Sequence, residues 1–140
     1  MSLMISIRNK SLLFSFILIS SLMCHSVYAE DDDPFSVAYI ELTPNFIVNN
    51  ASEGSRLRYI KTSISIRTEL AKKELIEANM PLVRDALVMF LSSLTPDQVA
   101  GAIAREQTRK EAAIAVNQAL QEETGIAPVT DILFASFVTQ

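Results

Sequence analysis

The sequence predicts one small α+β domain, in which an antiparallel or mixed sheet is covered by helices on one face. Residues 57–69 alternate apolar and polar side chains with the two-residue period of a strand. Residues 72–124 place apolar side chains at the three- and four-residue intervals that are typical of amphipathic helices. Residues 129–139 are rich in β-branched and aromatic side chains. We expect this last strand to pair with residues 57–69, across the helical middle of the domain.

The first 29 residues have the order of a secretory leader. Arg8 and Lys10 precede an uncharged apolar run of 13 residues, 11–23, and Ala29 stands directly before an acidic cluster at 30–33. Signal-peptide cores span roughly 7–15 residues, whereas a membrane helix needs about 18–20. We therefore expect cleavage after Ala29; the alternative is an uncleaved anchor that extends to the same residue. Both interpretations export the rest of the chain.

Composition and charge limit the classes of function that are open to the exported part of the chain. Residues 30–36 are acidic, contain a proline and are predicted to be a short linker to a single domain at 37–140. Loss of the two basic leader residues takes the net charge from −4 to about −6, which argues against a nucleic-acid partner. Cys24 and His25 both lie in the leader, so the domain has neither residue type.

The lack of cysteine and histidine argues against common kinds of active site. The domain has no thiol nucleophile, no imidazole base and none of the commonest transition-metal ligands. We expect no enzyme activity, no cofactor, no metal site and no small-molecule substrate. A carboxylate-only glycan hydrolase stays open as a minor hypothesis, with Asp85, Asp97 and Asp131 as its acids. Without disulfides, stability must come from a hydrophobic core.

Three strand segments are expected before the helices. Two short β-prone runs, 39–42 and 46–49, are predicted to be split by a turn or break at Pro44. Residues 49–55 are predicted to form a loop. The long strand 57–69 follows, with one face made of Ile60, Thr62, Ile64 and Ile66.

The helical middle contains two boundary signals. Residues 72–94 carry one apolar stripe, and Pro81 either opens a second helix with Asn79 as its cap or kinks a continuous one. Thr95 and Gln98 form a capping-box pattern that starts the next helix. The apolar stripe of the first region comprises Val83, Leu87, Phe90, Leu91 and Leu94.

The second helical region is predicted to run to Thr124, in two parts around Gly101, and to end at Gly125. Its inward residues are expected to be Ile103, Ala113, Val116 and Leu120, and its outward residues Arg105, Glu106, Arg109 and Lys110. The last strand is apolar on both faces and should be buried or paired. One face is expected to carry Ile132, Phe134 and Val138, and the other Leu133, Ala135 and Phe137.

Four stretches in this order and spacing resemble the FliL family of bacterial flagellar basal-body-associated proteins. They are residues 39–49 (YIELTPNFIVN), 58–66 (RYIKTSISI), 81–87 (PLVRDAL) and 129–140 (VTDILFASFVTQ). The sequence differs from the family pattern in its leader-like start. It also has Ala102-Ile103-Ala104 where a charged stretch usually follows the glycine.

The resemblance implies a periplasmic domain with a stomatin-like (SPFH-type) fold on the periplasmic side of the inner membrane, at the flagellar basal body. It further implies a non-enzymatic role with the stator units in motility, chemotaxis and swarming, and assembly into homo-oligomeric rings. The alternative function is a soluble periplasmic adaptor or inhibitor that binds another envelope protein.

Candidate interaction residues come from two segments. Arg84 and Asp85 are the charged pair most like the family motif; they could contact a partner at a ring or stator interface, or simply form a surface ion pair or a helix-cap contact. Phe134 and Phe137 could form a strand edge where a partner docks, or simply belong to the core. A basic stripe could contact an acidic partner or lipid headgroups, or be a solvated face; it comprises Arg105, Arg109 and Lys110.

Overall fold

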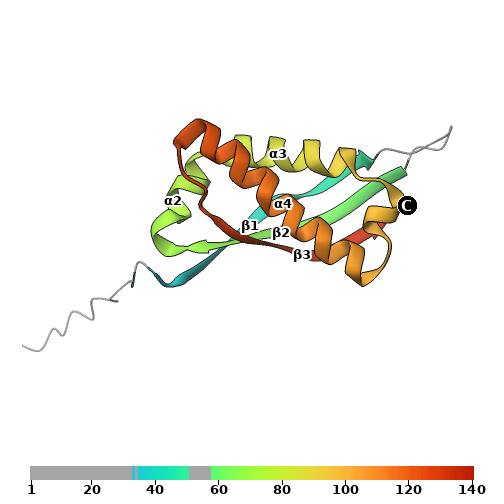
Figure 1. The fold of residues 1–140 in the computed structure, drawn as a ribbon, viewed down its shortest axis with the longest axis horizontal. Helices are drawn as coiled ribbons and strands as arrows, with labels where there is room; N and C mark the ends of the chain where they lie inside the picture. The colour runs from blue at the N-terminus through green and yellow to red at the C-terminus, as the bar shows by residue number, and fades with distance from the viewer. Residues whose placement is uncertain (1–32, 34, 51–57) are drawn as a thin grey trace, which may run out of the picture. The chain divides into compact units, whose positions relative to one another are not determined.

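Three antiparallel strands form the sheet of this domain, in the order β1 (Val37–Asn50), β2 (Arg58–Glu69) and β3 (Val129–Thr139) (Figure 1). The computed structural model describes residues 33, 35–50 and 58–140. The predicted leader and most of the predicted loop at 49–55 lie outside the described residues. Strand β2 is central, and Ile66 of β2 faces Ile132 of β3. The expected pairing of the terminal strand with residues 57–69 is therefore confirmed.

The predicted break at Pro44 is wrong, because β1 is one continuous strand. Its register with β2 shifts so that residues 43–45 lie opposite the single residue Ser63. Two extra residues leave the side-chain alternation unchanged, so Leu42 and Phe46 both point into the core. A proline is tolerated here because β1 is an edge strand and the bulge interrupts its ladder of hydrogen bonds.

Two helices follow β2 and are separated at Asn79. They are α2 (Leu70–Ala78) and α3 (Met80–Ser93), and Pro81 lies in the first turn of α3. The open question about Pro81 is thus settled in favour of a second helix. Asn79 does not cap α3 through its side chain, because its Nδ2 donates to the carbonyl oxygen of Leu75 at 2.9 Å. The asparagine instead closes the end of α2.

The second helical region divides as expected. A 3₁₀ helix, η2 (Pro96–Val99), precedes α4 (Gly101–Thr124). The backbone N–H of Thr95 donates to Oε1 of Gln98 at 2.8 Å, which confirms the capping interaction at this boundary. Gly101 and Gly125 have φ of 84° and 77°, values that favour glycine, and Gly125 ends α4 as predicted.

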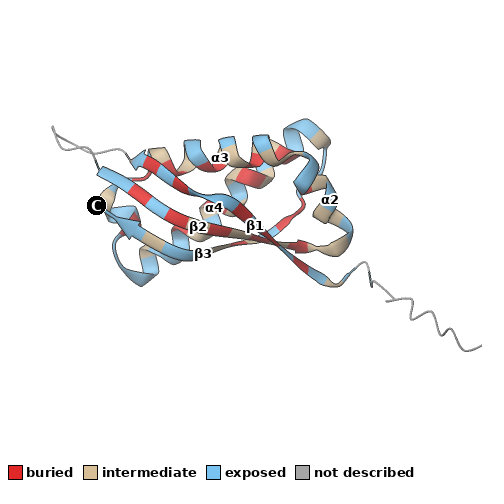
Figure 2. Ribbon diagram, turned by 180° about the vertical axis from the view of Figure 1, so that it is seen from behind, coloured by how far each residue is buried: buried red, intermediate tan, exposed pale blue. Residues whose placement is uncertain are grey.

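The helices cover one face of the sheet, and the core lies between this face and the helices (Figure 1). Buried residues alternate with exposed ones along β1 and mostly with partly buried ones along β2 (Figure 2), as the sequence pattern of β2 predicts. Three predicted stripe residues of α3 are completely buried, namely Val83, Leu87 and Leu91. Burying one such side chain contributes about 1.5–3 kcal/mol to stability.

The predicted inward face of α4 is partly wrong. Ile103 is 89% exposed, and the buried residues of α4 are Thr108, Ala112, Val116 and Leu120. These recur every four residues, and a position five residues before Thr108 is rotated by about 140° from that stripe. The polar Thr108 can lie in the stripe because its hydroxyl donates to the carbonyl oxygen of Gln98 at 2.7 Å.

The predicted faces of β3 are also partly wrong. A bulge near Ala135 puts Phe134 opposite Ile64 and Phe137 opposite Thr62, so both rings lie on the helix-covered face. The hydroxyl of Thr62 donates to the carbonyl oxygen of Ser136 at 2.6 Å and fixes the displaced strand. Val138, predicted on the face of Phe134, is 46% exposed.

None of the helices within residues 33, 35–50 and 58–140 is long and apolar enough to cross a membrane.

Arg84 attaches α3 to the bulge of β1. Its Nη2 donates to the carbonyl oxygen of Pro44 at 2.9 Å, and its guanidinium carbon lies 4.3 Å from the centre of the Phe46 ring. No ion pair joins Arg84 to Asp85 among the described residues, and Asp85 is exposed. Arg84 therefore contributes to the fold itself, through a bond between segments 40 residues apart.

Substitution of Arg84 by alanine is expected to lower the free energy of unfolding by about 1–2 kcal/mol, because it removes a charged hydrogen bond and a cation–π contact. Urea unfolding of the full chain, followed by circular dichroism, measures this change. The matched control is Asp85→Ala on the next, exposed position, which should change stability by less than about 0.5 kcal/mol. Equal stabilities for the two variants would contradict the structural role of Arg84.

Candidate interaction surfaces

Helix α4 lies along the outer edge of β3 and satisfies part of its backbone. The side chain of Asn117 donates from Nδ2 to the carbonyl oxygen of Val129 and accepts the N–H of the same residue at Oδ1, both at 2.8 Å. This pair of bonds imitates the pairing of a neighbouring strand. The sequence analysis missed Asn117, since an asparagine in the middle of a helix carries no local signal of such a contact.

A cluster of charged residues lies two helical turns before Asn117 on α4. Arg109 binds Glu106 through two hydrogen bonds, of 2.7 and 2.9 Å, and also forms an ion pair with Asp131 of β3. The hydrogen bond from Arg109 lowers the pKa of Glu106, and the same interaction raises the pKa of Arg109. Arg109 was predicted to face outward, but its side chain is only 22% exposed because it bridges α4 to β3.

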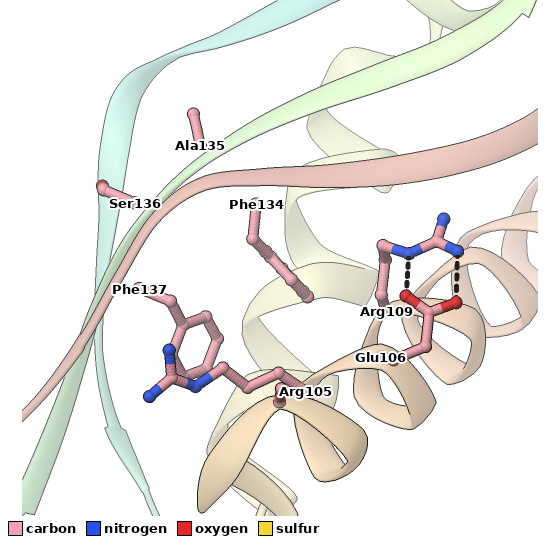
Figure 3. A pocket seen from close by; sticks show the side chains of 8 residues that line it. Arg105, Glu106, Arg109, Phe134, Ala135, Ser136 and Phe137 are labelled. Carbon is pink, nitrogen blue, oxygen red and sulfur yellow. Dashed lines mark hydrogen bonds and ion pairs between the residues drawn. The ribbon is translucent and has the colours of Figure 1, made fainter.

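The next turn of α4 and the second half of β3 enclose an open groove of about 320 Å³ (Figure 3). The rings of Phe134 and Phe137 meet edge to face there, with 5.2 Å between their centres. Both rings are half-buried and pack against the core, which agrees with the core interpretation; a role in partner docking stays a prediction. The remaining lining residues are Ala102, Arg105, Glu106, Arg109, Ala135 and Ser136.

A second, shallower groove of about 340 Å³ lies between the outer sides of α3 and α4. Met89, which is 67% exposed, lines it. Asp85 lies one helical turn before Met89 on α3, so an exposed carboxylate and an exposed apolar side chain share this surface. We call the surface of Asp85, Val88 and Met89 the α3 face.

The structure separates the three acids of the hydrolase hypothesis. Asp85 is on α3, Asp97 is in η2 and Asp131 is on β3, where it is paired with Arg109. Among the described residues, the three grooves on this surface contain only one of these acids, Asp97. In the part of the chain that the structure describes, no cluster of acidic, histidine or cysteine residues could hold a metal ion. The described residues therefore do not bring together the pair of acids that this hypothesis needs.

Replacing Arg109 by glutamine should raise the pKa of Glu106 back toward its ordinary value, because the main cause of its shift is removed. In the native protein, the contact between Arg109 and Glu106 contributes its full stability at pH values above the pKa that Glu106 has in the unfolded chain. This contribution is lost as the pH falls through the lowered pKa of Glu106 in the folded protein. Carboxyl NMR titration of Glu106 measures the shift. Lys110→Gln, a control that removes a weaker contact, should move it less; an unchanged Glu106 titration in Arg109→Gln would contradict the assignment.

Comparison with known proteins agrees with the resemblance that the sequence predicts. Residues 39–140 match the family described as "Flagellar basal body-associated protein FliL". A protein of Aquifex aeolicus (strain VF5) named "Flagellar protein FliL" is 30% identical over 103 residues, covering 71% of this chain and 60% of that protein. The chain thus spans less than two thirds of the length of this curated relative. The family match covers β1 from Tyr39 onward, the other two strands and every helix described above, and the chain therefore belongs to the FliL family of flagellar basal body-associated proteins.

Proposed function

We propose that this protein is a non-enzymatic accessory component of the flagellar motor that associates with the stator units and supports motility and swarming. The family match carries the proposal, because it covers the domain from Tyr39 in β1 to Gln140. The separated acids and the surface character of the two grooves are consistent with binding. The stomatin-like comparison is part of the same proposal and rests on the family resemblance.

The proposed location is the periplasmic side of the inner membrane at the basal body. The basic residues, apolar run and acidic cluster at the start of the sequence support export. An uncleaved leader would hold the domain at the membrane, whereas cleavage after Ala29 would release it to the periplasm. Protein sequencing of the membrane and periplasmic fractions distinguishes the two.

The α3 face is the proposed contact with the stator or with the next copy in a ring. Asp85 is exposed and pairs with no described residue, while Val88 and Met89 beside it are 39% and 67% exposed. Apolar side chains next to a single charge suit an interface in which the charge fixes orientation. Arg84 would take part only indirectly, by holding α3 on β1.

Deletion of the gene should reduce swimming and swarming while flagellar filaments are still assembled, since the proposed role is in motor output. Swarm diameter, swimming speed and filament counts by electron microscopy measure the effect. Normal motility in the deletion strain would reject the motor role and favour the periplasmic adaptor or inhibitor.

Complementation tests the α3 face. The wild-type chain should restore motility, whereas Asp85→Arg should fail to do so at an equal protein level, because it reverses the charge of the proposed contact. The matched control is Glu74→Arg, which reverses an exposed charge on α2 and should restore motility fully. Equal rescue by both variants would remove Asp85 from the interface.

A further inference from the structure

The outer edge of β3 is covered unequally by α4. At its start, Asn117 binds both backbone groups of Val129. The N–H of Ile132 donates to Oδ1 of Asp131 at 2.8 Å, and Arg109 approaches the carbonyl oxygen of Ile132 at 3.5 Å. The first half of this edge is thereby closed to a further strand.

The second half of the same edge is open. Tyr59 and Gln140 exchange both backbone hydrogen bonds, of 3.0 and 3.1 Å, so Gln140 faces β2. In an antiparallel ladder the direction of the bonds alternates, and Phe137 and Thr139 therefore present their N–H and C=O groups away from β2. Within the described residues, no strand and no side chain pairs with these groups. An edge of this kind is a template for another extended segment.

The groove between α4 and β3 lies directly at this open half of the edge, as its lining by residues 134–137 shows (Figure 3). The Phe134 and Phe137 rings give it an apolar wall, and helix α4 forms its other side. A groove between an edge strand and a helix matches the way in which extended peptides add a strand to a sheet.

The charges of the groove favour an acidic ligand. The positive charge of Arg109 is balanced by its ion pairs with Glu106 and Asp131. Arg105 donates from Nε to the carbonyl oxygen of Val99 at 3.3 Å, and its guanidinium has no carboxylate partner in the described part of the chain. A carboxylate arriving in the groove would meet this free guanidinium, with which it can form charge-assisted hydrogen bonds.

We propose that this groove binds an extended acidic segment of another protein by strand addition to β3. The segment pairs with the backbone of Phe137 and Thr139, places an apolar side chain against the Phe134 and Phe137 rings, and directs a carboxylate to Arg105. The proposal is independent of the motor role, because it concerns binding by the purified protein.

Selection from a displayed library of random octapeptides, with the purified full chain as bait, tests the site. The enriched peptides should alternate β-branched and polar residues and share one aspartate or glutamate. Selection on Arg105→Gln should lose this acid, and selection on Lys110→Gln should keep it. Lys110 is a matched control because it lies on the same helix, carries the same charge and is outside the groove lining.

Affinity and position are then measured on one enriched peptide. Replacing its acid by the corresponding amide should weaken binding about tenfold, consistent with loss of a charge-assisted bond. Thr139→Pro should weaken it as well, because proline removes one edge donor without disturbing the pairing with β2. Amide NMR shifts should cluster at residues 134–139.

Three outcomes would overturn the proposal. They are the absence of a shared acid among the enriched peptides, equal weakening by Arg105→Gln and Lys110→Gln, and amide shifts that lie elsewhere in the domain. Sedimentation tests another occupant: self-association that Arg105→Gln abolishes, without competition by peptide, would assign the groove to a second copy instead.

Discussion

The central strand β2 supports the whole domain, because a sheet of three strands has only one strand that is paired on both sides. The alternate residues Ile60, Ile64 and Ile66 of β2 are at most 1% exposed, beneath the helices. So small a sheet needs a packed layer to be stable on its own. Strands β1 and β3 complete the ladder on either side, and α3 and α4 supply the apolar surface above it.

The irregularities of the fold are confined to the two edge strands, where they interrupt fewest hydrogen bonds. The bulge of β1 takes up Pro44 and is held by Arg84, and the bulge of β3 is held by the hydroxyl of Thr62. A polar side chain from helix α3 and another from β2 itself thus stabilise strand segments that cannot follow the regular register of β2. A polar side chain also limits strand addition at β3, because Asn117 of α4 binds the backbone of Val129 and so closes one half of the outer edge.

Helix α4 covers one half of the outer edge of β3 and leaves the other half open, and this difference links the fold to the proposed binding. Where Asn117 and Arg109 reach the strand, the backbone is satisfied and the charges are balanced. One helical turn further toward the start of α4, Arg105 forms no ion pair with any described carboxylate, and no described segment pairs with the strand edge beside it. A domain of the FliL family with this arrangement offers two distinct surfaces, the groove beside β3 and the α3 face on its outer helix.

The sequence by itself determined the features that depend on neighbouring residues. The two-residue period of β2, the capping interaction of Thr95 with Gln98 and the end of α4 at Gly125 are all local, and the structure confirms them. The pairing of the last strand with β2 was also predicted, from the length of residues 57–69, although β1 is at least as long in the structure. Four dispersed stretches, taken in their order and spacing, were enough to indicate the family that the match over residues 39–140 shows.

Only the tertiary structure decided which side chains share a face or a contact when a bulge or a distant segment is involved. Phe137 joins Phe134 on the core side because one extra residue shifts the register of β3, and no local pattern announces such an insertion. Arg84 binds the chain 40 residues earlier, at a carbonyl group exposed by the bulge of β1. The candidate groove likewise exists only because α4 crosses the end of β3, which brings Arg105 beside two phenylalanines far from it in sequence. Local periodicity specifies the elements, whereas their mutual register depends on packing that acts across the whole chain.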